Sequence, residues 1–280
     1  MAKNPFDPSD LEKALGGRYL LGDELRVGGQ GVVYRATRVL DENGGGCKED
    51  VAIKFHLDSR QDARVEREIA AVKNVRHQAL AALLEDGVVR MGVRDVRYIA
   101  WEFIEGEALD TKISAGAMTE RAVVQVAIDV VSAIAVLWSR RIVHRDISPK
   151  NIMVRPDGRA VLIDLGGARH LDNTTITAPG ATFGTVGYLS PEQCRAEHAL
   201  TSASDVFALG VVMLECLAGR HPTNFDQHRL MSSVLPVSTL VPNATRELRE
   251  LIEGMVRLRA PFRPRIAQLQ ASFREFLGAR

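Results

Sequence analysis

The sequence contains few cysteines, and they are not arranged to bind a metal or to form a disulfide framework. Its three cysteines, Cys47, Cys194 and Cys216, are odd in number and widely separated. This spacing excludes a structural zinc site and a set of disulfide bridges, and it fits a reducing compartment.

The sequence also has almost no excess of charge of either sign. It carries 36 Lys and Arg against 35 Asp and Glu, for a net charge of +1. Nonspecific nucleic-acid binding as the main activity is therefore not expected, because it depends on a positive surface. The apolar fraction of 46% and the charged fraction of 25% are ordinary globular values, and 280 residues can bury a substantial core.

No long apolar run is free of polar residues. The longest, AVVQVAIDVVSAIAVLW, is interrupted by Gln125, Asp129 and Ser132, which favours a buried helix over a membrane span. The opening MAKNPFDPSD has no apolar segment of signal-peptide length, so we expect no membrane segment in this chain and a cytoplasmic location, unless the chain is part of a larger membrane protein. Residues 1–18 are predicted to be a flexible N-terminal lead-in.

Two kinds of hydrophobic pattern follow one another along the chain. Strand-like alternation at residues 19–27, 32–40, 51–57, 87–90 and 98–104 is joined by one helical segment, residues 60–75. After residue 105 the helical period dominates, with helices expected at 119–141, 202–218, 243–257 and 263–277 around two short strands, IMV and AVLID. These patterns predict an α+β fold with a sheet-rich part at 19–104 and a helical part at 105–280.

Two features of the first part, residues 19–104, have the chemistry to bind a nucleotide. The cluster GGQGVVY, which starts at Gly28, lets backbone amides approach phosphates, although a plain hairpin turn has the same composition. Lys54 ends the apolar strand VAIK, where a buried ammonium group needs a carboxylate such as Glu68, or second Glu66. The alternative is an exposed lysine at a strand end.

Three polar residues of the second part match the needs of phosphoryl transfer. In HRDISPKN, Asp146 can accept a proton from an attacking hydroxyl, and Asn151 offers an amide oxygen to a divalent cation. In IDLGG, Asp164 follows an apolar strand and offers a carboxylate to the same cation. Turn and cap residues alone can also produce such a group.

The order of these motifs resembles the eukaryotic-type protein kinase catalytic domain, of the serine/threonine class found also in bacteria. The series is GGQGVV, VAIK, REI, HRDISPKN, DLG, GTVGYLSPE and DVFALG, and it covers the chain from Tyr19 to Leu277. The resemblance implies a bilobal fold, with a small antiparallel sheet lobe carrying one main helix and a larger helical lobe. It also implies transfer of the γ-phosphoryl group of ATP to serine or threonine hydroxyls of proteins, with autophosphorylation as a further possibility.

The resemblance also implies a role for each matching residue. Gly28 and Gly31 would cover the ATP phosphates, and Lys54 would contact them and pair with Glu68. Asp146 would orient the substrate hydroxyl, Lys150 would reach the transferred phosphate, and Asn151 and Asp164 would hold Mg²⁺. The residues expected around the adenine are Leu25, Val33, Ala52, Glu102, Ile104 and Met153.

Other family features concern the substrate and the scaffold. GTVGYLSPE favours a protein substrate and places Thr185 opposite Asp146. Glu192 is expected to pair with Arg263, and Asp205 to hold the catalytic-loop backbone. The loop between Asp164 and Glu192 contains several threonines, and a phosphate on one of them would order the loop by pairing with Arg145. The alternative is a flexible loop in which the threonines have no such role. Those threonines are Thr174, Thr175, Thr177 and Thr182.

The sequence departs from the family pattern at three positions. Arg26 replaces the first glycine of the phosphate loop, and Leu165 replaces the commoner phenylalanine after Asp164. Ser148 occupies the place usual for lysine, with Lys150 two residues later. The changes at Arg26 and Ser148 motivate an alternative, a nucleotide-binding pseudokinase or scaffold that regulates a partner. A small-molecule kinase is a third possibility, and the physiological substrate and oligomeric state stay open.

Overall fold

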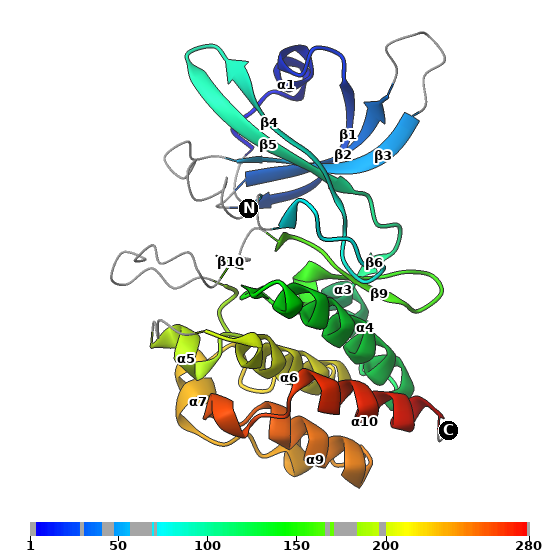
Figure 1. The fold of residues 1–280 in the computed structure, drawn as a ribbon, viewed down its shortest axis with the longest axis vertical. Coiled ribbons are helices and arrows are strands. Elements are labelled where there is room, and N and C mark those ends of the chain that lie inside the picture. Colours follow the sequence, from blue (N-terminus) through cyan, green and yellow to red (C-terminus); the bar gives the residue numbers. More distant parts are fainter. Residues whose placement is uncertain are drawn as a thin grey trace. The chain divides into compact units, whose positions relative to one another are not determined.

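The computed structural model divides the chain into two compact units. The first combines Met1–Arg76 with Ala81–Phe103, and the second combines His77–Leu80 with Ile104–Arg280. The structure describes residues 4–28, 31–40, 48–56, 69, 72–165, 169–170, 184–195 and 200–278. Together the units confirm the mixed α+β fold, a sheet unit followed by a mostly helical one (Figure 1).

The first unit is built on a five-stranded antiparallel sheet of order β1-β2-β3-β5-β4. Its strands are β1 (Tyr19–Gly28), β2 (Gly31–Val39), β3 (Lys48–His56), β4 (Leu83–Met91) and β5 (Arg94–Glu102). Side chains alternate between the faces of a strand, so Tyr34, Ile53 and Phe55 share one face and form the core of this unit. The opposite face carries the residues predicted to bind nucleotide.

A helix precedes the sheet where a flexible lead-in was expected. Helix α1 (Pro8–Ala14) begins after Asp7, whose carboxylate accepts from the Ser9 amide at 2.9 Å. Leu11 and Leu15, one helical turn apart, are fully buried in the core of the sheet unit. The prediction of a flexible lead-in was therefore wrong for this segment. The capping aspartate, the proline in the first turn and the apolar pair are helix signals that the prediction did not use.

The main helix predicted for the first unit lies mostly outside the described residues, as do Glu66 and Glu68. Its described positions include Ile69 and Val72, which are both buried. The Lys73 amide donates to the Ile69 carbonyl at 2.8 Å, the spacing of an α-helical turn.

The second unit is mostly helical. Its helices are α3 (Leu109–Ser114), α4 (Glu120–Ser139), α5 (Pro191–Cys194), α6 (Ser202–Ala218), α7 (Gln227–Ser232), α8 (Val237–Leu240), α9 (Arg246–Met255) and α10 (Ile266–Gly278), with 3-10 turns η2 (Pro149–Asn151) and η4 (Ala260–Phe262). Short strands β6 (Glu107–Ala108), β8 (Ile152–Val154) and β9 (Ala160–Leu162) form one sheet, and β7 (Ile142–Val143) pairs with β10 (Arg169–His170).

Helices α4 and α6 form the centre of this unit. Thr119 caps α4 as predicted, with its hydroxyl oxygen accepting from the Ala122 amide. By length and composition α4 is the one helix among the described residues that could cross a membrane, but most of it is buried in the unit. Its buried Asp129 is held by Arg159 at 2.8 Å and by the Ala160 amide at 2.9 Å. This helix therefore has the packing of a core helix.

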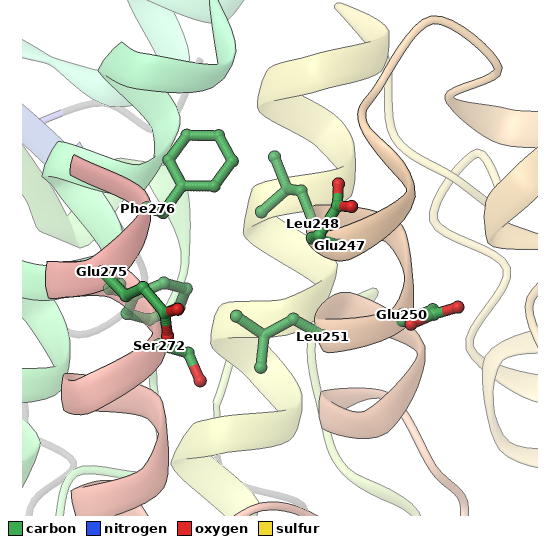
Figure 2. A pocket seen from close by; sticks show the side chains of 8 residues that line it. Glu247, Leu248, Glu250, Leu251, Ser272, Glu275 and Phe276 are labelled. Carbon is green, nitrogen blue, oxygen red and sulfur yellow. The ribbon is translucent and has the colours of Figure 1, made fainter. Parts of the chain in front are cut away.

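Helices α9 and α10 leave a groove of about 530 Å³ between them. Figure 2 shows Leu248, Leu251 and Phe276 on the facing sides of the groove, with Ser272 and Glu275 on α10. Leu248 is buried, whereas Leu251 and Phe276 are half-buried, which is usual where two surface helices meet. None of the predicted site residues lines this groove.

Candidate active site

The register of the sheet brings the predicted nucleotide residues of the first unit to one face. Val33 lies opposite Lys54, which lies opposite Ile99, and Ala52 lies opposite Trp101. Residues directly opposite in an antiparallel pair point to the same face, so these side chains share the face opposite the Phe55 core. Among these side chains Lys54 carries the only charge, and Arg35, which also lies opposite Ala52, adds a guanidinium group to the same face.

Lys54 is 7% exposed, so the alternative of an exposed strand-end lysine is wrong. A lysine this buried is held by interactions that offset its desolvation. Its predicted partner Glu68 lies outside the described residues, and that pairing stays a prediction.

Gly28 and Gly31, at the β1–β2 hairpin, differ in whether the packing of the strands requires a glycine at that position. A Cβ on Gly31 would lie 2.3 Å from the Phe55 carbonyl oxygen, so the close approach of β2 to β3 demands glycine there. A Cβ on Gly28 would meet no atom of the described residues within 4 Å, although Gly28 pairs with Gly31. Strand packing therefore explains Gly31 but not Gly28, where the sequence predicts a phosphate.

The remaining residues predicted around the adenine belong to both units, Leu25 and Glu102 to the first and Ile104 and Met153 to the second. Leu25 is half-exposed on β1, and Glu102 ends β5 with its amide donating to the Ala82 carbonyl at 2.8 Å. Ile104 is the buried residue at which the second unit resumes. Met153 lies on β8 between buried Ile152 and Val154, so it points to the opposite side of that strand.

Asp146 has a fixed orientation in the second unit. Its Oδ1 accepts from both the amide and the hydroxyl of Thr185, each at 2.7 Å. The Asn151 Nδ2 donates to Asp146 Oδ2 at 2.8 Å and to the Asp146 carbonyl at 2.9 Å. The predicted contact of Thr185 with Asp146 is confirmed. An aspartate held at both oxygens presents a defined acceptor to a neighbouring hydroxyl.

The backbone before Asp146 is held by Asp205 of α6, as predicted. The Asp205 carboxylate accepts from the amides of His144 and Arg145, each at 2.9 Å. Burial raises the pKa of Asp205, and these two backbone bonds oppose that rise. Arg145 adopts a left-handed φ of 71°, a strained conformation that such bonds from outside the loop can maintain. Gln193, which the sequence did not reveal, donates to the Arg145 carbonyl at 2.9 Å.

Asn151 and Asp164 fit the chemistry of a magnesium site. The Ile163 amide donates to the Asn151 carbonyl at 2.8 Å, which ties the residue before Asp164 to the catalytic loop. Asp164 itself has a left-handed φ of 58°. Asn151 Nδ2 donates to Asp146, and the amide oxygen Oδ1 is an atom of the kind that Mg²⁺ prefers as a ligand. The described residues hold no cluster of three or more His, Cys, Asp or Glu that would bind another metal.

The unusual Ser148 and Lys150 lie in different environments. Ser148 is fully buried and accepts from the Thr185 hydroxyl at 3.4 Å, so a lysine there would be buried. Lys150 is exposed and, with Thr185, lines a surface groove of the second unit. Of the two positions, 150 is therefore the one that places a cation at the surface of the groove that Thr185 lines.

The predicted ion pair of Glu192 and Arg263 is confirmed and buried. Arg263 Nη1 lies 2.6 Å from Glu192 Oε1, and Nη2 lies 2.9 Å from Oε2. Burial opposes ionisation of Glu192, but the bonds and charge of Arg263 outweigh it and lower the pKa of the carboxyl. The Ser204 hydroxyl adds a third bond at 2.7 Å. This pair joins α5 to the C-terminal region.

Comparison with known proteins agrees with this geometry. The protein kinase domain family matches residues 19–273, which is most of the chain. The chain belongs to the protein kinase family. Membership of this family implies the use of ATP, and the match includes Lys54, Asp146, Asn151 and Asp164.

Individual relatives are bacterial kinases. The chain is 34% identical over 243 residues to the serine/threonine-protein kinase PrkC of Bacillus subtilis, covering 84% of the chain and 36% of that protein. It is 32% identical over 262 residues to the serine/threonine-protein kinase PknL of Mycobacterium tuberculosis, covering 86% of the chain and 61% of that protein. The chain thus spans between about a third and three fifths of these relatives.

Proposed function

We propose that this kinase domain transfers the γ-phosphoryl group of ATP to serine or threonine hydroxyls of protein substrates. The observation that carries the proposal is Asp146, held at both carboxylate oxygens by Thr185 and Asn151 in a chain of the protein kinase family. The similarity to bacterial serine/threonine kinases and the GTVGYLSPE segment support a protein substrate.

In the proposed mechanism, Asp146 accepts a hydrogen bond from the substrate hydroxyl and directs its oxygen towards the phosphorus. Thr185 and Asn151 prevent rotation of the carboxylate, so little reorganisation accompanies the reaction. The hydroxyl proton passes to Asp146 as the new P–O bond forms and ADP leaves. Asn151 and Asp164 would hold Mg²⁺, which when bound neutralises charge on the phosphates.

The first unit would bind the nucleotide. Lys54 would contact the phosphates, and Gly28 and Gly31 would lie over them. Val33 and Ala52 share a face with Lys54, which supports an apolar seat for the adenine. The other residues that the sequence predicts around the adenine are Leu25, Glu102, Ile104 and Met153.

Lys150 would supply the positive charge that lysine at position 148 supplies in most serine/threonine kinases. Its exposure beside Thr185, together with the burial of Ser148, supports this assignment. The charge would stabilise the transferred phosphoryl group in the transition state.

Phosphate transfer from radiolabelled ATP to a generic basic protein tests the function. Wild-type protein with Mg²⁺ should produce phosphoserine or phosphothreonine, whereas Asp146→Asn and Lys54→Met should lose about two orders of magnitude of rate or more. Asp157→Asn, in the exposed turn between β8 and β9, is the matched control and should label like wild type. Magnesium-dependent ATP binding without turnover by the wild type would instead support the pseudokinase alternative.

A further inference from the structure

A groove of about 870 Å³ on the second unit adjoins the proposed catalytic residues. Lys150 and Thr185 form part of its wall, and Thr185 is the residue that bonds Asp146. The rest of the wall includes residues from 110–114, 186–188 and 215–225. A peptide whose hydroxyl reaches Asp146 would therefore lie along this wall.

His221 is the buried residue that joins two parts of the wall. It is 8% exposed, and its Nε2 lies 2.9 Å from the Gly187 carbonyl oxygen. Its Nδ1 accepts from the Phe225 amide at 2.8 Å and from the Thr223 amide at 3.3 Å. Because Nδ1 accepts two N–H groups, the proton of the neutral ring is on Nε2 and is donated to Gly187. The contacts select one tautomer.

The loop that His221 holds is strained. Asn224 and Phe225 both have left-handed φ values, 51° and 63°, although neither is glycine. The His221 ring stacks on Phe225 with centroids 4.3 Å apart and meets the edge of Tyr188 at 5.2 Å. This loop therefore depends on the His221 ring both for its amide bonds and for packing.

The segment that contains Gly187 packs closely against the other side of His221. Gly187 has a φ of +97°, and a Cβ there would lie 2.9 Å from Phe225 Cδ1 and 3.1 Å from His221 Nε2. Two residues earlier, Thr185 is bonded to Asp146. The short segment from Thr185 to Gly187 is thus fixed at Asp146 by one end and at His221 by the other.

Between these anchors lies an apolar surface. Val186 is 60% exposed and Phe225 is 50% exposed, and both line the groove. Val186 precedes Gly187, whose carbonyl oxygen bonds His221, and the Phe225 amide donates to His221. The positions of both side chains therefore depend on His221. Among the described residues, the hydrogen bonds and ring contacts of the His221 side chain are with Gly187, Tyr188, Thr223 and Phe225, and none is with Asp146 or a residue proposed to bind ATP.

We propose that His221 is a positioning residue for the protein substrate, which in its Nε2-protonated tautomer fixes Val186 and Phe225 along the wall of the groove. The proposal rests on the protein kinase function proposed above. It assigns His221 to substrate affinity, through Gly187 and the 221–225 loop, and to no part of nucleotide binding.

Steady-state kinetics with myelin basic protein as the probe substrate test this assignment. His221→Ala should raise KM for the protein about tenfold, as expected for loss of buried hydrogen bonds, and leave KM for ATP within about twofold. His221→Gln, which can still donate to the Gly187 carbonyl, should recover most of the affinity. His228→Ala, an exposed histidine on α7, is the matched control and should behave like wild type.

The pH dependence of KM gives a second readout should His221→Ala fail to fold. Burial lowers the pKa of His221, so the neutral ring persists through neutrality and protonates in the acid range. Protonation converts Nδ1 from acceptor to donor, so the wild-type KM for the protein should rise there, and His221→Gln should lack that rise. The other charged groups around the groove, which His221→Gln retains, are Asp110, Lys150, Glu215, Arg220, Asp226 and Arg229.

The outcomes separate the two proposals. If wild type phosphorylates the protein but KM for it is unchanged in His221→Ala, the positioning role is overturned and the kinase function stands. Equal changes in the KM values for protein and ATP would also overturn it, because they indicate general loss of structure. Absence of any wild-type phosphorylation would overturn both. In the pH series, parallel wild-type and His221→Gln profiles contradict the role of the tautomer.

Discussion

Thr185 binds Asp146 twice, through its amide and its hydroxyl, and both donate to the same carboxylate oxygen at 2.7 Å. The two residues are 39 positions apart in the sequence. The contact connects the segment that forms the substrate groove to the proposed catalytic aspartate. A change at Thr185 therefore tests whether the orientation of Asp146 matters to the reaction.

Thr185→Ala should lower kcat by about tenfold to a hundredfold. It removes one hydroxyl bond to a carboxylate, which contributes about 1.5–3 kcal/mol, and retains the amide bond. Thr185→Ser keeps the hydroxyl and should stay within about threefold of wild type. Steady-state kinetics at saturating ATP measure the effect, and equal rates for the alanine and serine variants would show that the hydroxyl is not needed.

Lys150→Ala should lower kcat by about tenfold or more with little change in KM for ATP, because the charge is proposed to act on the transferred group. Ser148→Ala should have a small effect, since Ser148 forms only a long bond of 3.4 Å with Thr185. Initial rates at several ATP concentrations measure both. A normal kcat for Lys150→Ala together with a large loss for Ser148→Ala would reverse the assignment.

The ion pair of Glu192 and Arg263 should make stability depend on pH. Because the folded-state pKa of Glu192 is lowered, its contribution is present above the unfolded pKa and is lost as pH falls through the folded value. The difference in Tm between wild type and Glu192→Gln should therefore shrink as pH falls from neutral into the acid range. A difference that is constant with pH would contradict this.

Removal of Arg263 should lower the free energy of unfolding more than neutralisation of Glu192 does. Arg263→Met leaves a buried carboxylate without its cation and should lower the free energy of unfolding by about 3–5 kcal/mol. Urea unfolding measures it, with the exposed Arg246→Met, on the surface pair with Glu250, as the control. Equal losses for the two variants would rule out the special role of burial.

Helix α1 should contribute to the stability of the sheet unit. Leu11→Ala removes a fully buried side chain from its core and should lower the free energy of unfolding by about 2–5 kcal/mol. Lys13→Ala, on the exposed side of the same helix, should change it by less than about 0.5 kcal/mol. Equal urea midpoints for both variants would restore the view of a flexible lead-in.

The sequence predicts the long elements well because their signals are local. Helix α6 was predicted at its observed bounds, between the capping Thr201 and the left-handed Gly219. Helices α7 and α8 have six and four residues, too few for a hydrophobic period, and were missed.

The residues of the candidate site also divide into those with a local sequence signal and those without one. Asp146, Asn151 and Asp164 could be predicted as site residues because the motif places them in a fixed order. His221 gave no signal, since its contact with Gly187 joins residues 34 positions apart.

The rate of the phosphoryl-transfer step in a single turnover, at saturating ATP and Mg²⁺, tests the central claim most directly when Asp146→Asn is compared with wild type. If Asp146 aligns the acceptor hydroxyl, the variant should transfer phosphate at least about a hundredfold more slowly while its affinity for ATP is unchanged. A variant that transfers phosphate within twofold of the wild-type rate would contradict it.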